Sequence, residues 1–133
     1  MKVHHIGYLV KDIHKSIPSF EELGYSIVKK TVYDKARDVN ICFMQQDGYC
    51  IELVEPCSEK SVVYDQLKRQ GNTPYHICYE VDDLESTIEE YRSQKYVLMQ
   101  PPAVAPAIDG RRVAFMFHRT VGMIELVEMT NNR

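Results

Sequence analysis

Two histidines and two glutamates have the residue types and the spacing of a metal site. The separation of His5 from His76 is nearly the same as the separation of Glu52 from Glu125. Imidazole nitrogens and carboxylate oxygens are ordinary ligands of divalent first-row metals, and two of each leave positions open for water or substrate. The four side chains therefore predict one site for a divalent metal ion such as Zn²⁺, Ni²⁺ or Co²⁺.

The near-equal separations come from an internal repeat. When the chain is shifted along itself, His5-Ile6 aligns with His76-Ile77, and a slightly larger shift aligns Ile51–Glu55 with the identical segment Ile124–Glu128. Each copy is short for an independent core, so the two are expected to pack together. We expect one domain, 1–133, with its parts in the order module one (about 1–57), linking helix (about 61–70) and module two (about 74–129).

Each copy has the pattern of a strand, a helix and three further strands. Apolar and polar residues alternate over 4–10 and 75–81, as is typical of strands. Asp12 and Asp83 follow as helix N-caps. The remaining strands are expected at 25–32, 39–46 and 49–55 in the first copy and at 96–100, 112–118 and 123–128 in the second. The predicted fold class is α+β, with two repeated βαβββ modules.

Strand alternation places the four candidate ligands on the sheet face away from the helices. Glu52 and Glu125 alternate with apolar neighbours, and His5 and His76 occupy the equivalent phase of their own strands. A single strand histidine or glutamate is usually a satisfied or solvated residue, but the joint pattern favours metal ligation. The other histidines lack this support: His4 has the helix-side phase, and His14 and His118 are expected to be surface or structural residues.

Composition excludes several classes of protein. The chain has 44% apolar and 26% charged residues and a net charge of −3, with basic residues scattered along it, which argues against a nucleic-acid surface. No apolar run reaches the length of a membrane span or a signal peptide, and the four cysteines have no C-x-x-C spacing. We therefore expect a cytoplasmic protein with reduced thiols and no nucleic-acid or membrane partner.

Four segments carry a family resemblance: His5-Ile6-Gly7-Tyr8-Leu9-Val10-Lys11-Asp12, Ile51-Glu52-Leu53-Val54-Glu55-Pro56, His76-Ile77-Cys78-Tyr79-Glu80-Val81-Asp82-Asp83, and Val113-Ala114-Phe115 through Ile124-Glu125-Leu126. Through them the chain resembles the vicinal oxygen chelate (VOC) superfamily over nearly its whole length. The branch it resembles most holds glyoxalase I (lactoylglutathione lyase) and methylmalonyl-CoA epimerase. The resemblance implies the glyoxalase/bleomycin-resistance/dioxygenase fold, with curved mixed sheets around a metal bound by His5, Glu52, His76 and Glu125.

The resemblance also implies an activity. Members of this branch transfer a proton next to a carbonyl through a metal-bound enediolate, with the metal acting as a Lewis acid. Our leading expectation is a metal-dependent lyase or isomerase of glyoxalase I type that acts on a thiol adduct of an α-ketoaldehyde. Glu125 is then the leading candidate for the base, and Glu52 is the second catalytic carboxylate. One divalent metal ion per site and a homodimer are expected.

Two alternatives remain open. The first is a methylmalonyl-CoA epimerase or related acyl-thioester isomerase, which Glu55-Pro56-Cys57-Ser58 favours because it lacks a glutathione-binding asparagine. Against it, such epimerases usually have glutamine at the position of Glu52 and a glutamate in the loop that corresponds to 33–38. The second is a non-catalytic, small-molecule-binding resistance protein, which would be expected to lack the metal quartet. The basic pairs Lys29-Lys30 and Arg111-Arg112 are either solvated strand ends or binding groups for a substrate carboxylate or phosphate.

Overall fold

The computed structural model describes residues 1–129 and divides them between two compact units. The N-terminal unit comprises His5–Tyr75, and the C-terminal unit combines Met1–His4 with the chain from His76 onward. Residues 130–133, which the expected domain includes, lie outside the described residues. That both units belong to one domain stays a prediction.

The order of elements is the predicted one, two βαβββ modules with a helix between them. The first module runs through β1 (Lys2–Leu9), α1 (Ile13–Glu22), β2 (Ser26–Asp34), β3 (Val39–Gln46) and β4 (Tyr49–Pro56). The linking helix α2 (Tyr64–Gln70) follows. The second module runs through β5 (Thr73–Val81), α3 (Leu84–Ser93), β6 (Val97–Ala105), β7 (Arg111–His118) and β8 (Gly122–Glu128), with a short 3-10 turn at Pro106–Ile108.

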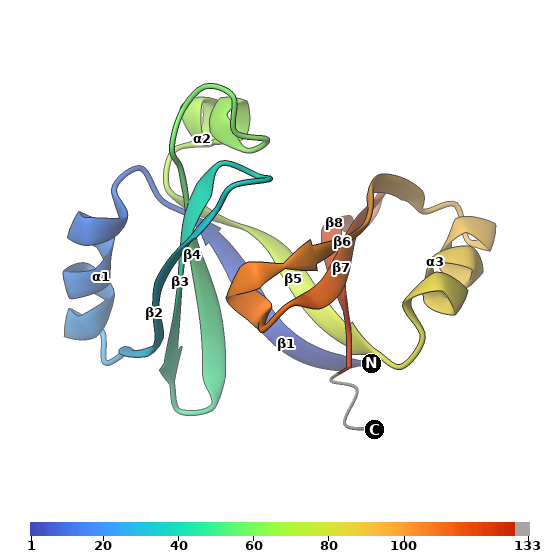
Figure 1. The fold of residues 1–133 in the computed structure, drawn as a ribbon, viewed down its shortest axis with the longest axis horizontal. Coiled ribbons are helices and arrows are strands. Elements are labelled where there is room, and N and C mark those ends of the chain that lie inside the picture. The colour runs from blue at the N-terminus through green and yellow to red at the C-terminus, as the bar shows by residue number, and fades with distance from the viewer. Residues whose placement is uncertain (130–133) are drawn as a thin grey trace. The chain divides into compact units, whose positions relative to one another are not determined.

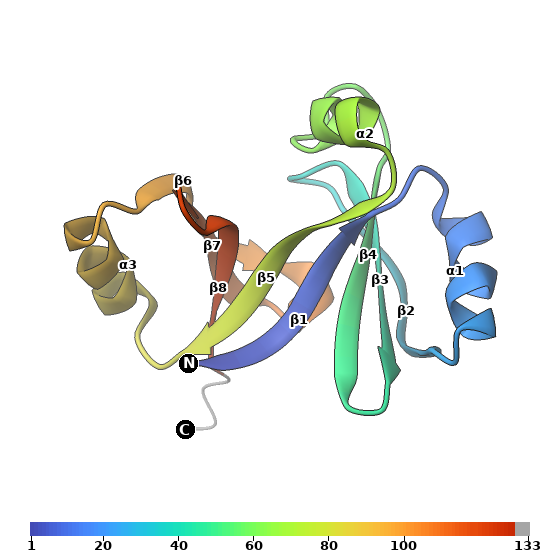
Figure 2. The same cartoon turned by 180° about the vertical axis from the view of Figure 1, so that it is seen from behind.

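The sheet of the N-terminal unit is mixed, with strand order β2-β3-β4-β1. β2, β3 and β4 are antiparallel neighbours, whereas β1 runs parallel to β4, and the two lie side by side in Figure 2. α1 covers one face of this sheet, as Figure 1 shows. Asp12 caps α1 by accepting hydrogen bonds from the amides of His14 and Lys15. The buried core on the helix side consists of Val10, Ile13, Cys42, Met44, Ile51 and Leu53.

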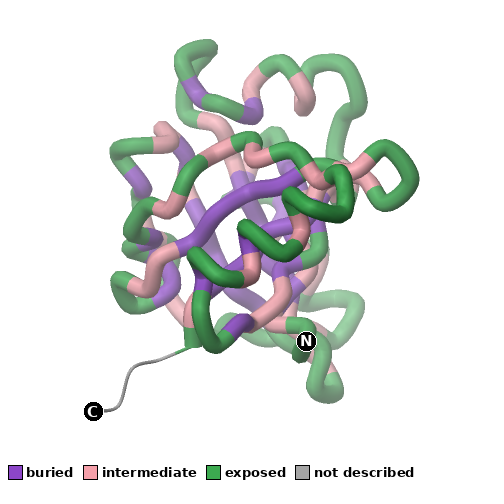
Figure 3. The backbone as a smooth tube through the Cα atoms, turned by 90° about the vertical axis from the view of Figure 1, so that its right-hand side faces the viewer, coloured by how far each residue is buried: buried purple, intermediate pink, exposed green. Residues whose placement is uncertain are grey.

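The sheet of the C-terminal unit repeats this plan. Its strand order is β5-β8-β7-β6, with β5 parallel to β8 and the other neighbouring pairs antiparallel. Asp83 caps α3 by accepting a hydrogen bond from the amide of Ser86. The buried core on the helix side consists of Val81, Leu84, Ile88, Ala114, Met116, Ile124 and Leu126. Most buried residues of both units belong to strands, and Figure 3 marks the buried stretches of the chain in purple.

Two boundaries differ clearly from those expected. α2 begins at Tyr64 and not at residue 61, because residues 61–63 form a bend and a turn, and its N-cap, Val63, provides no side-chain acceptor for the first amides. β6 continues through Pro101-Pro102 to Ala105, beyond the strand expected at 96–100. β6 is the outer strand of its four-stranded set. Proline is tolerated there because the backbone on the outer side of an edge strand has no neighbouring strand to which an N–H group must donate.

Both outer strands are bulged at equivalent places. In β2 the register shifts between Ile27 and Lys29, and in β6 it shifts between Leu98 and Gln100. A bulge inserts an extra residue, bends its strand and increases the local twist. The curvature that the family resemblance implies therefore has a physical cause within each sheet.

Leu126→Ala is expected to lower the free energy of unfolding by about 2–5 kcal/mol, because Leu126 is fully buried in the core under α3. Chemical denaturation monitored by circular dichroism measures the change. The control is Val121→Ala at an exposed position, which should change stability by less than about 0.5 kcal/mol. Equal effects of the two substitutions would contradict the assigned core.

The longest helices, α1 and α3, have 10 residues each. Among residues 1–129, no helix is both long enough and apolar enough to cross a membrane.

Candidate metal centre

His5 and Glu52 form a buried pair in the N-terminal unit. β1 and β4 are parallel neighbours with Gly7 opposite Glu52, so His5, two residues before Gly7, presents its side chain on the same face as the carboxylate. His5 Nε2 lies 3.3 Å from Glu52 Oε1, and the side chains are 0% and 6% exposed. This face is opposite the apolar core under α1.

His76 and Glu125 form the equivalent pair in the C-terminal unit. Here β5 and β8 are the parallel neighbours, and Cys78 lies opposite Glu125. His76 Nε2 lies 3.0 Å from Glu125 Oε1, and the side chains are 0% and 4% exposed. The prediction that each histidine shares a face with its glutamate is therefore confirmed in both modules.

Two phenylalanines complete the surroundings of the pairs. Phe43 lies opposite Glu52 and packs edge-to-face on the His5 ring, with 5.2 Å between centroids and 81° between planes. Phe115 lies opposite Glu125 and packs on His76 in the same way, at 5.2 Å and 89°. Edge-to-face packing fixes the orientation of each imidazole. The sequence pattern did not single out Phe43, although alignment of the third strands of the two copies pairs it with Phe115.

The chemistry of these donors fits a divalent metal ion. A carboxylate buried away from water must be paired with a cation or hydrogen-bond donors, since an unpaired buried charge costs several kcal/mol. Each unit offers one imidazole nitrogen and one carboxylate oxygen in direct contact, and a divalent ion binds such donors in this mixture. Each pair therefore contributes two donors of the kind that a divalent ion binds.

The remaining histidines lie outside these pairs. His14 is exposed on α1. His118 stacks on Tyr96 with 4.6 Å between centroids, and its Nδ1 accepts a hydrogen bond from the Thr120 amide, which is a structural role.

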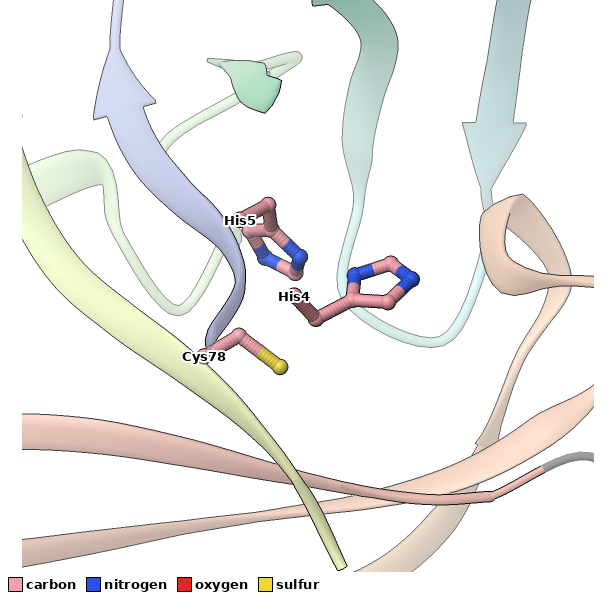
Figure 4. A group of neighbouring side chains, drawn as sticks. All are labelled: His4, His5 and Cys78. Atoms are coloured by element: carbon pink, nitrogen blue, oxygen red, sulfur yellow. The ribbon is translucent and has the colours of Figure 1, made fainter. Parts of the chain in front are cut away.

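His4 offers a nitrogen donor close to a thiol. Figure 4 shows it next to His5 on β1, with Cys78 on β5. His4 and Cys78 belong to the same unit, and a ring nitrogen of His4 lies within 4.8 Å of the buried Cys78 Sγ. One imidazole and one thiol fall short of the four ligands of a structural zinc site, so we assign no metal to them.

Comparisons with known proteins agree with this geometry. Residues 4–115 match the family model described as Glyoxalase/Bleomycin resistance protein/Dioxygenase superfamily. The chain is 23% identical over 130 residues to a mitochondrial methylmalonyl-CoA epimerase of Dictyostelium discoideum, covering 96% of this chain and 78% of that protein.

Solved structures of epimerases have the same fold. The crystal structure of methylmalonyl-CoA epimerase from Mycobacterium tuberculosis matches with a TM-score of 0.84 at 24% identity, covering 98% of this chain and 89% of that one. A methylmalonyl-CoA epimerase in complex with methylmalonyl-CoA and NH4+ matches with a TM-score of 0.81 at 21% identity, covering 97% and 94%.

Proposed function

The chain belongs to the glyoxalase/bleomycin resistance protein/dioxygenase superfamily, and from this premise we propose that it is a metal-dependent isomerase that moves a proton next to the carbonyl of an acyl thioester. The observation that carries the proposal is the pair of buried His–Glu contacts at equivalent positions of the two modules. A binding protein without chemistry has no need for two buried carboxylates, so the resistance-protein alternative is disfavoured.

We assign both pairs to one divalent ion. Each pair supplies two donors, and four donors complete a metal site with room for substrate ligands. The repeat supports the assignment, because the two modules present the same residue types from the same strands. Whether one chain or two supply each site, the native metal and the expected homodimer stay predictions.

The two carboxylates have the chemistry for epimerisation. A divalent ion bound by the four side chains would supply a Lewis acid for the substrate's carbonyl oxygen and thereby acidify the neighbouring C–H. Glu125 would accept that proton on a carboxylate oxygen. Glu52 comes from the other module, and its carboxyl group would deliver a proton to the opposite face of the same carbon. The bond that breaks and the bond that forms are both C–H bonds, so the configuration inverts without redox change.

The similarity to named epimerases supports an acyl thioester as the substrate class. A second candidate is a glyoxalase-type lyase acting on a thiol adduct of an α-ketoaldehyde. One specific observation favours it: position 52 holds a carboxylate in contact with His5, which suits a metal site with two acidic ligands.

Solvent deuterium exchange distinguishes the candidates. Protein loaded in turn with Zn²⁺, Ni²⁺ or Co²⁺ is incubated in D₂O with methylmalonyl-CoA, and we expect deuterium at the carbon between the two carbonyl groups together with interconversion of the epimers. The comparison substrate is the hemithioacetal of methylglyoxal with glutathione. Turnover of the hemithioacetal alone would establish the lyase, and turnover of neither substrate would contradict both candidates.

A further inference from the structure

We propose that Lys29 binds the free carboxylate of the substrate and thereby selects acyl thioesters of malonyl type over uncharged ones. The proposal rests on the proposed function and adds a specificity-determining residue to it. Lys29 lies on β2, two strands away from Glu52.

The register of the N-terminal sheet places Lys29 on the face of the His5–Glu52 pair. Lys29 lies opposite Phe43 on β3, and Phe43 lies opposite Glu52 on β4. Residues directly opposite in antiparallel strands share a face. Phe43 packs on the His5 ring, which identifies that face as the one carrying the metal ligands.

The β2 bulge is what turns Lys29 toward this face. Ile27 lies opposite Met44, which belongs to the core under α1. Strict alternation would place residue 29 on the same side as Ile27. Because the register shifts between Ile27 and Lys29, Lys29 lies opposite Phe43 instead. The extra residue of the bulge therefore places the Lys29 side chain on the ligand side of the sheet and not on the helix side.

The distances suit a contact with a substrate bound at the pair. Neighbouring strands lie about 4.8 Å apart, so the Cα atoms of Lys29 and Glu52 are separated by roughly 10 Å across the sheet. An extended lysine side chain reaches about 6 Å from its Cα. The ammonium group can therefore meet a carboxylate that lies one or two bonds beyond the reacting carbon.

Cys50 provides independent evidence that these groups are neighbours. It precedes Glu52 by two residues on β4 and has the same facing. Burial raises the pKa of the Cys50 thiol, and the nearby Lys29 ammonium opposes this rise. The Lys29 ammonium thus lies within electrostatic range of a side chain on the same face as Glu52.

Only the first module has a cation at this position. In the C-terminal unit the equivalent row runs from Glu125 through Phe115 to Gln100, which is neutral. Lys29 therefore places a cation in the row of the first module only, at a position where the second module has a neutral amide. An anionic acyl group would then be attracted and held in one orientation.

Binding measurements test Lys29 without requiring turnover. Metal-loaded protein is titrated calorimetrically with malonyl-CoA, which carries the carboxylate, and with acetyl-CoA, which lacks it. Lys29→Met should weaken malonyl-CoA binding by roughly 10- to 100-fold, the range of a charged hydrogen bond, and leave acetyl-CoA binding within about threefold. Lys29→Arg should restore most of the preference. The control is Lys30→Met, at the exposed neighbouring position, which should behave like the wild type.

Equal weakening of both ligands by Lys29→Met, or no weakening of either, would overturn the proposal. If the wild type binds no acyl-CoA, the proposed function fails separately, and free malonate becomes the probe. Loss of malonate binding in Lys29→Met would then still support the carboxylate site. Malonate binding that Lys29→Met leaves unchanged, or a wild type that binds neither probe, would refute it.

Discussion

Glu125→Gln is expected to lower the rate of deuterium exchange into methylmalonyl-CoA by roughly 10²- to 10⁴-fold, the usual cost of removing a general base. An amide can still lie beside His76, but it cannot accept the substrate's proton. A carboxylate held by a metal is a weak base, so the wild-type side chain must loosen its hold on the ion as substrate binds. The large effect should therefore appear in kcat when metal is saturating.

Glu52→Gln is the matched control and is expected to be milder in exchange. With Glu125 intact, the variant still removes a proton from one epimer, but it lacks the acid that would reprotonate the opposite face. Racemic substrate should therefore exchange in one epimer without inversion, as followed by NMR in D₂O. Equal losses would show that the two carboxylates share both transfers, and a larger loss in Glu52→Gln would reverse their roles.

The repeat explains why so much of the site could be predicted from the sequence. Identical segments around Glu52 and Glu125 fix the register between the copies, and apolar alternation then gives the facing of every strand in both modules. Helix caps at Asp12 and Asp83 follow from a local rule, the need of the first helical amides for an acceptor. These features depend on short stretches of chain, so the sequence alone contains them.

Features that depend on strand partners could not be predicted in the same way. The bulge that turns Lys29 toward the ligand face exists only relative to β3, and alternation alone gives the wrong facing. Pro101-Pro102 is compatible with β6 only because that strand lies at the outside of its four-stranded set. The contact of Phe43 with His5 requires β1, β4 and β3 to lie in that order. In each case tertiary context decides between two locally acceptable structures.

The proposed function requires that the two His–Glu pairs bind one metal ion. His5→Ala and His76→Ala each remove one imidazole from a different unit, and either loss should weaken metal binding by more than the roughly 10- to 100-fold that loss of an outer-shell partner costs. Turnover should fall with the bound metal. His14→Ala, which alters an exposed histidine, serves as the control.

Elemental analysis after dialysis against a metal-buffered solution is the most direct measurement. We expect one divalent ion per chain in the wild type and in His14→Ala, and almost none in either His5→Ala or His76→Ala. Full metal occupancy in either of these two variants, or two ions per chain in the wild type, would contradict this expectation.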